Sequence, residues 1–301
     1  MPGELQIPQW EWWIVIYFFA GGIAGGAYLV SSVIELVGEP RDRPIARMGY
    51  YIAFAMLPIC AIALILDLGQ PLRFWHMVLY SRTFLPWPVW DSPMSVGTYA
   101  LLVFSLFSTL SFLDALVETG RLPWAPFRLK YSSVPRKIYA ILGGLAGFFL
   151  ASYTGVLLAH THIPAWANSP LIGALFLASG ASTGVAAIVL GLVLARTDVG
   201  ASWAKLKHFD NLAMILELVL LIALLVWLGS AAAVLLTGVS GILLIGGTLL
   251  IGLLLPLALQ FRAGFQGVKG TIGMTAVTAV LILIGGFILR MVIVLGVQGL
   301  L

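Results

Sequence analysis

The chain has 301 residues, of which 61% are hydrophobic and only 9% are charged, with a formal net charge of +4. This composition excludes an ordinary soluble enzyme, because the apolar runs are long enough to cross a bilayer core of about 30 Å. The positive charge lies in the segments between these runs, where it meets lipid headgroups. We therefore expect contact with membrane lipid and no binding of nucleic acid.

The apolar runs predict eight transmembrane helices in chain order. They cover residues 12–37, 46–66, 94–113, 138–159, 170–195, 211–228, 241–259 and 273–295, while residues 229–240 can be loop or helix. All basic residues except Arg73, Arg82 and Arg290 lie in or beside the first, third, fifth and seventh connections. Cytoplasmic loops carry the excess of Lys and Arg. We therefore predict an all-α membrane protein with eight transmembrane helices and both termini extracytoplasmic.

An internal repeat relates the two halves of the chain. Residues 18–26 of the first helix match residues 176–184 of the fifth at one Phe, one Ala and two Gly, and residues 147–150 match 286–289. The paired helices run in the same direction, so the repeat is of the parallel kind. We predict one integral membrane domain, residues 1–301, built as two four-helix bundles from residues 1–165 and 166–301.

Polar residues gather at the outer ends of the predicted helices, where ionisable groups at membrane depth are costly and indicate function. They are Tyr17, Asp67, Arg73, His76, Tyr153, His160 and Arg290. Their donors, acceptors and aromatic faces suit a flat redox ring with two carbonyl or hydroxyl oxygens. The alternative is structural: Asp67 caps its helix and pairs with Arg73, and Arg290 is a buried ion-pair partner.

Carboxylates also occur in the inner half of two predicted helices. Glu217 belongs to the sixth helix, Asp210 directly precedes that helix, and Glu35 belongs to the first. Together with Arg290 they form a possible proton path, since buried carboxylates can relay protons. Pairing with a neighbouring donor is the structural alternative.

Histidine and cysteine positions argue against a metal centre in this chain. None of the four histidines lies in the middle of a span, as the axial ligand of a transmembrane haem would. His160 and His162 bring no thiolate or obvious carboxylate to complete a metal site, and the single cysteine, Cys60, lies inside the second span. We expect neither haem nor metal.

Four segments, in chain order, resemble the NrfD/polysulfide reductase membrane-subunit family: residues 17–29, 67–76, 152–159 and 285–290. The resemblance implies a multi-pass subunit of the bacterial or archaeal cytoplasmic membrane that binds quinone (menaquinone or ubiquinone) near the extracytoplasmic face. It implies a ferredoxin-like multi-cluster iron–sulfur partner docked at that face. That partner connects to a molybdopterin or multihaem cytochrome catalytic subunit, so this chain alone is not an enzyme.

The resemblance also assigns roles to residues. Tyr153 matches a tyrosine that family members place at the quinone, Tyr17 stands where a quinone-contacting histidine lies, and a nearby asparagine of the family falls at Ile14. Asp67, Arg73 and His76 belong to a motif of longer family members. The predicted quinone contacts are Tyr17, Asp67, Arg73, His76, Tyr153 and His160.

Two other functions fit parts of the sequence. A secondary transporter is permitted by the parallel repeat and by Glu217, although transporters usually place their site near the midplane. A passive membrane anchor would hold catalytic subunits without contacting quinone. The polar cluster at one membrane face favours the quinone site over the transporter.

Overall fold

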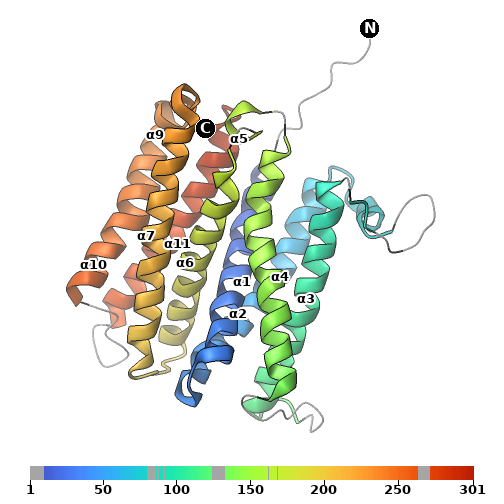
Figure 1. Cartoon of the computed structure of the whole chain (residues 1–301), viewed down its shortest axis with the longest axis vertical. Coiled ribbons are helices and arrows are strands. Elements are labelled where there is room, and N and C mark those ends of the chain that lie inside the picture. Colours follow the sequence, from blue (N-terminus) through green and yellow to red (C-terminus); the bar gives the residue numbers. More distant parts are fainter. Residues whose placement is uncertain are drawn as a thin grey trace.

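The chain forms a bundle of long helices in its computed structural model, which describes residues 10–79, 86, 88–90, 92–123, 133–161, 163–167, 169–263 and 272–301 (Figure 1). No strand occurs in those ranges. Eight segments are long and apolar enough to cross a membrane: Trp12–Val37, Pro40–Asp67, Pro93–Glu118, Val134–Ala159, Leu171–Leu194, Ser202–Leu236, Gly238–Phe261 and Gly273–Gly296. The prediction of eight spans in an all-α, multi-pass membrane protein is confirmed.

Each span is built from one or more helical elements. The first four are α1 (Trp12–Val37), α2 (Arg43–Asp67, preceded by the 3-10 turn η1, Pro40–Asp42), α3 (Pro93–Glu118) and α4 (Val134–Ala159). The next two are α6 (Leu171–Leu194) and α7 (Ser202–Leu228). The seventh joins α9 (Gly238–Ile242), the π-helical η5 (Leu243–Leu254) and α10 (Leu255–Ala263), and the eighth joins α11 (Ile272–Met291) to the π-helical η6 (Val292–Gly296). Short helices connect them: η2 (Pro71–Met77), α5 (Pro164–Ala167), η4 (Gly229–Ala232) and α8 (Ala233–Leu236).

The segment left open between loop and helix is mostly helical. Elements η4 and α8 carry the sixth span on to residue 236, and α9 begins at Gly238. Gly229 and Gly238 have backbone φ values of +54° and +61°. Glycine adopts this region without the steric cost that other residues meet, so these two positions are where the chain changes direction.

Several helices begin earlier than the apolar pattern predicts. Residues 46, 138 and 211 were the expected starts, but α2, α4 and α7 begin before them and include Arg43, Arg136 and Lys205. These cations are all ion-paired: Arg43 and Arg136 are buried, and the half-exposed Lys205 has its Nζ 2.6 Å from Asp42 Oδ2. A prediction from hydropathy ends each span at the first charged residue. In the structure the helix continues past that residue because its charge is paired.

Helices α1 and α6 form the centre of the bundle. In their most apolar stretches 83% and 72% of the residues are buried, against 56% or less for the other six spans. Their backbones nearly touch: a Cβ at Gly26 would collide with the carbonyl of Gly180, and one at Gly184 would collide with the backbone at Ala27. Small residues permit such close helix packing in lipid, which explains the glycine-rich pattern of both helices.

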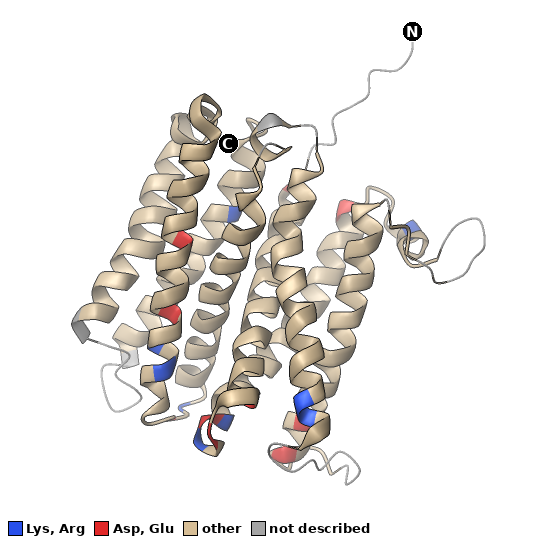
Figure 2. Cartoon of the chain, in the orientation of Figure 1, with Lys and Arg blue, Asp and Glu red and all other residues tan. Residues whose placement is uncertain are grey.

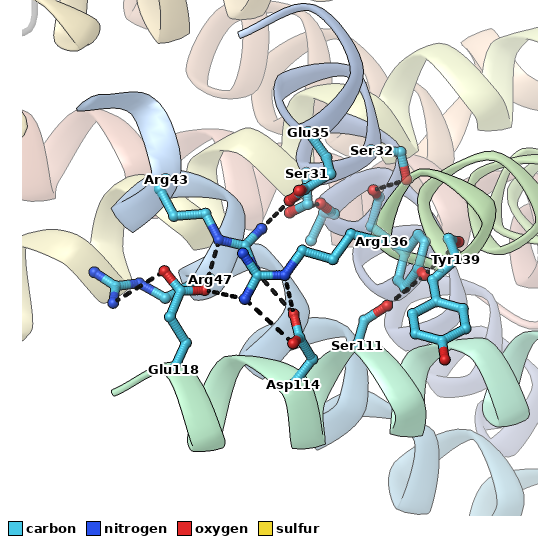
Figure 3. A network of polar contacts seen from close by, with 12 residues as sticks. Ser31, Ser32, Glu35, Arg43, Arg47, Ser111, Asp114, Glu118, Arg136 and Tyr139 are labelled. Atoms are coloured by element: carbon cyan, nitrogen blue, oxygen red, sulfur yellow. Dashed lines mark hydrogen bonds and ion pairs between the residues drawn. The ribbon is translucent and has the colours of Figure 1, made fainter. Parts of the chain in front are cut away.

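A network of buried charges joins α1, α2, α3 and α4 at the lower end of Figure 1, where most of the charges drawn in Figure 2 also lie. Arg43 contacts Glu35 and lies 3.2 Å from Asp114 and 2.8 Å from Glu118. Arg136 lies 2.7 Å from Asp114 and 2.9 Å from Glu118 (Figure 3). We call these five residues the lower ion-pair network. Each of the four helices contributes at least one member, so the network fixes all four together.

Removal of one member should destabilise the bundle strongly. Arg43→Met leaves buried carboxylates short of a cation, which typically costs about 3–5 kcal/mol. The matched control is Arg41→Met, because Arg41 and its partner Glu39 are more than half exposed and such pairs contribute about 0–1 kcal/mol. Thermal unfolding in detergent should show a large drop in Tm for Arg43→Met alone; equal Tm values for the two variants would contradict this role.

Candidate functional site

A cavity of about 440 Å³ lies at the upper end of the bundle, between α1, α2, α3 and α4. Tyr17 of α1, Asp67 at the end of α2 and Tyr153 of α4 all line it. Its remaining walls are almost entirely apolar, and Phe74, from the short helix η2, belongs to them. The structure thus brings together three of the six predicted quinone contacts in one cavity.

The hydroxyl of Tyr17 and the carboxylate of Asp67 are the available polar groups of this cavity. Tyr17 is 1% exposed and Asp67 is half-buried. Across the described ranges neither side chain has a hydrogen-bond or ion-pair partner, and Asp67 does not pair with Arg73. Buried polar groups normally find partners. These two therefore offer a donor and an acceptor to a ligand in the cavity.

The Tyr153 hydroxyl has an internal partner instead. It donates a hydrogen bond to the carbonyl of Pro93 in the first turn of α3, and its ring stacks on Phe149 with centroids 5.6 Å apart. The ring also lies directly against Gly97, where any Cβ would overlap it. Tyr153 thus attaches the upper end of α3 to α4.

The other three predicted contacts lie outside the cavity lining. Arg73 and His76 are exposed on η2, where His76 Nδ1 lies 3.2 Å from the Arg73 carbonyl and the imidazole stacks on Trp75. His160 is also exposed, with Nδ1 2.9 Å from the Val156 carbonyl. Their contact with quinone stays a prediction. His162 lies outside the described residues, within which no cluster of His, Cys, Asp or Glu is placed to hold a metal.

Some cavity residues escaped the sequence analysis. Trp10 lines the cavity and is held by two hydrogen bonds between its backbone and the side chain of Gln298, at 2.8 and 2.9 Å. Gly97 and Thr98 supply the α3 wall. None of these positions carries a charge or a periodic signal. These residues reach the cavity because segments distant in sequence pack together, and no local sequence pattern predicts that packing.

A second buried polar group surrounds Arg290, which is fully buried between α1, α6 and α11. Its guanidinium donates to the Phe18 carbonyl at 3.1 Å, the Ser179 hydroxyl at 3.0 Å and the Gly286 carbonyl at 2.8 Å. Glu217 of α7 is 3% exposed and hydrogen-bonds to the same Ser179 hydroxyl. Ser179 therefore links the Glu217 carboxylate to Arg290, and one of the other partners of Arg290 is Phe18, the residue next to Tyr17.

The remaining candidates for the proton path lie in two different places. Asp210 is fully buried one and a half to two helical turns before Glu217 on α7, and accepts hydrogen bonds from Ser182 at 3.1 Å and Gln260 at 2.6 Å. Glu35 belongs to the lower ion-pair network through Arg43. The structure thus groups Asp210, Glu217 and Arg290 in the second half of the chain and does not bring Glu35 to them.

Comparison with known proteins gives consistent matches over the whole chain. Residues 2–301 match the protein family described as "Polysulphide reductase, NrfD". A polysulfide reductase polypeptide of Wolinella succinogenes is 28% identical over 93% of this chain and 92% of its own length. The NrfD homolog of Haemophilus influenzae is 28% identical over 82% of both chains. A selenate reductase subunit of Mesobacillus selenatarsenatis is 29% identical over 27% of this chain and 20% of its own.

The contact between Gly97 and Tyr153 predicts a steric effect at the cavity. Gly97→Ala should displace the tyrosine ring and lower stability by about 1–3 kcal/mol, the usual cost of overpacking. Gly246→Ala is the control, because a Cβ there would meet no atom within 4 Å. Thermal unfolding should separate the two variants, and Gly97→Ala/Tyr153→Leu should lose less than the sum of its single changes. Strict additivity would contradict the contact.

Proposed function

Because the chain belongs to the polysulphide reductase (NrfD) family, we propose that it is the quinone-binding membrane subunit of a respiratory oxidoreductase complex. The observation that carries this proposal is the apolar cavity into which an unpaired Tyr17 hydroxyl and an unpaired Asp67 carboxylate project. Ligand sites of about 300–1,000 Å³ are typically apolar with a few placed polar groups. The volume and the polar groups of this cavity fit the ring of a menaquinone or a ubiquinone.

We propose a different role for each side chain that lines this cavity. A bound quinol supplies two electrons and two protons when it is oxidised. The Tyr17 hydroxyl donates a hydrogen bond to one ring oxygen. The Asp67 carboxylate accepts one of the two released protons, and the other passes to water at the upper surface. The Tyr153 hydroxyl keeps its hydrogen bond to the Pro93 carbonyl and contributes its ring to the cavity wall. Trp10 and Phe74 add aromatic rings to the wall of the cavity.

The proposal includes the orientation of the chain and its partners. The bonds between Trp10 and Gln298 hold the two ends of the described chain at the upper end of the bundle, next to the cavity. The distribution of Lys and Arg supports an extracytoplasmic position for this end. An iron–sulfur subunit docked there would take or supply the electrons. Relatives named as components of polysulfide reductase and selenate reductase support a complex with a molybdopterin or multihaem catalytic subunit.

We propose that the chain is built from two four-helix bundles. Helices α1 to α4 pack in a closed ring, as do α6, α7, the seventh span and α11. Equivalent positions make equivalent contacts: Gly25 lies against Gly147 in the first half, and Thr183 lies against Gly286 in the second. These pairs follow the register of the sequence repeat, which supports a division at residues 165/166.

A proton path through the second half is a separate proposal. Glu217, Ser179 and Arg290 form a connected series that ends at the Phe18 carbonyl, beside Tyr17. Asp210 lies nearer the lower end, at the start of this route. The same bonds also satisfy the structural alternative, in which Glu217 is paired through Ser179 only for stability.

The rival functions are less well supported by the site. A transporter would need its binding groups near the midplane, whereas Asp67 is the last residue of α2. A passive anchor would have no use for an unpaired buried tyrosine beside an unpaired carboxylate. Family membership among reductase subunits also favours the oxidoreductase.

Loss of the Tyr17 hydroxyl tests the quinone site. In the purified complex, Tyr17→Phe should lower quinone-linked electron transfer about two- to tenfold, because a hydrogen bond to a neutral partner contributes about 0.5–1.5 kcal/mol. Tyr51→Phe is the matched control, since its hydroxyl bonds Ala115 O at the lower end. Assembly should be unchanged in both. Equal quinone kinetics for Tyr17→Phe and the wild type would remove Tyr17 from the site.

Replacement of Glu217 separates the two roles proposed for it. If Glu217 relays protons, Glu217→Gln should preserve quinone chemistry and abolish proton uptake from the inner side. If Glu217 is structural, the amide should lower Tm and leave the proton count per electron unchanged. The measurement is proton uptake and release per quinone turnover in proteoliposomes, and an identical ratio in variant and wild type would end the relay hypothesis.

A further inference from the structure

We propose that the gap between the upper halves of α2 and α3 is a lateral portal, through which the isoprenoid tail of the quinone leaves the cavity into the lipid. This inference rests on the proposed function, because it takes the ligand to be a quinone. It adds the route by which a lipid-dissolved substrate reaches the site.

At their upper ends the two helices face each other across the cavity, while lower down they pack together, as where Phe54 stacks on Phe112. On α2 the lining residues are Ala61, Leu64, Ile65 and the terminal Asp67, and Leu68 follows at the C-cap. On α3 they are Met94, Gly97, Thr98, Leu101 and Leu102. Both sets have the spacing of three and four residues that marks one face of a helix. The cavity therefore separates α2 from α3 over about two turns at their upper ends. We define the portal by these residues.

The portal opens toward the hydrocarbon of the membrane. Met94 and Leu102 line the cavity and are also 48% and 46% exposed. Ile62 on α2 and Leu106 on α3 do not line the cavity, and these apolar side chains are each 57% exposed. A surface of this kind contacts lipid. On the opposite side the cavity ends at Tyr17, which is buried in the core.

The lining of the cavity becomes less polar from its inner wall to the portal. The free hydroxyl of Tyr17 lies on the inner wall, whereas the portal side chains are apolar except Thr98 and Asp67, which is the last residue of α2. The Thr98 hydroxyl is already bonded to the Met94 carbonyl at 2.9 Å. A ring with two oxygens is thus best accommodated inside, and a branched hydrocarbon chain is best accommodated between α2 and α3.

A specific bond keeps the portal open. Tyr153 of α4 holds the first turn of α3 through Pro93, and Gly97 allows α3 to lie directly against the Tyr153 ring. The upper part of α3 is therefore fixed to α4 and away from α2. A lipid-soluble substrate can then enter from the bilayer between α2 and α3, without first crossing the aqueous surface at η2.

Narrowing the portal should discriminate between ligands with and without a tail. The variant is Ala61→Phe/Thr98→Phe, and the control is Ile62→Phe/Leu106→Phe, which adds the same rings on the lipid-facing sides of the same helices. The probes are tritiated 2-methyl-1,4-naphthoquinone and the same ring carrying four isoprene units, with equilibrium binding measured on the full chain in lipid nanodiscs.

The portal variant should raise Kd for the tailed quinone tenfold or more and change Kd for the tailless ring less than twofold, with both unchanged in the control. Unaltered binding of the tailed quinone, or equal weakening of both probes, would overturn the portal while the quinone site stands. A wild-type chain that binds neither probe would instead refute the proposed function.

A second measurement needs no substitution. A photoreactive diazirine on the first isoprene unit of the tailed quinone should label residues 61–68 and 94–102 of the wild-type chain. Labelling confined to α6, α7 or α11 would overturn the portal even if the substituted chains fail to fold.

Discussion

Pairing of buried charges inside the bundle is the constraint on which the rest of this structure depends. A charged group in a lipid-embedded core is costly unless it is paired and hydrogen-bonded. At the lower end the chain meets this requirement with Glu35, Arg43, Asp114 and Arg136, which also tie α1 to α4 together. At the upper end Tyr17 and Asp67 face a cavity without partners among the described residues. The contrast between the two ends is what identifies the upper cavity as a site.

The cavity exists because helix packing is uneven around α1. Glycines let α1 approach α6 closely at Gly26 and Gly184, and Tyr153 ties α3 to α4. The upper ends of α2 and α3 line the cavity on the other side of α1. In the second half of the chain, Arg290, Ser179 and Glu217 form internal hydrogen bonds instead. The described residues thus hold a cavity in one half of the chain and a paired polar core in the other.

The sequence predicted the number of spans because hydropathy and charge are local properties. It failed at the helix starts near Arg43, Arg136 and Lys205, whose charges are neutralised by partners distant in sequence. Of the six residues predicted to contact quinone, Tyr17, Asp67 and Tyr153 line one cavity, and their contact with quinone stays a prediction. The sequence could not show that Arg73 and His76 point away on η2. The α3 wall was missed because its lining residues carry no charge, and only tertiary packing brings them to Tyr17.

The central claim is that a quinone ring occupies the upper cavity between Tyr17 and Asp67. Its most direct test is an electron cryomicroscopy structure of the purified complex in nanodiscs, loaded with a quinone analogue. The account predicts ring density within hydrogen-bond reach of the Tyr17 hydroxyl, with Asp67 at the cavity edge. Ring density in the α6 to α11 half, with Tyr17 and Asp67 still without a ligand, would contradict it.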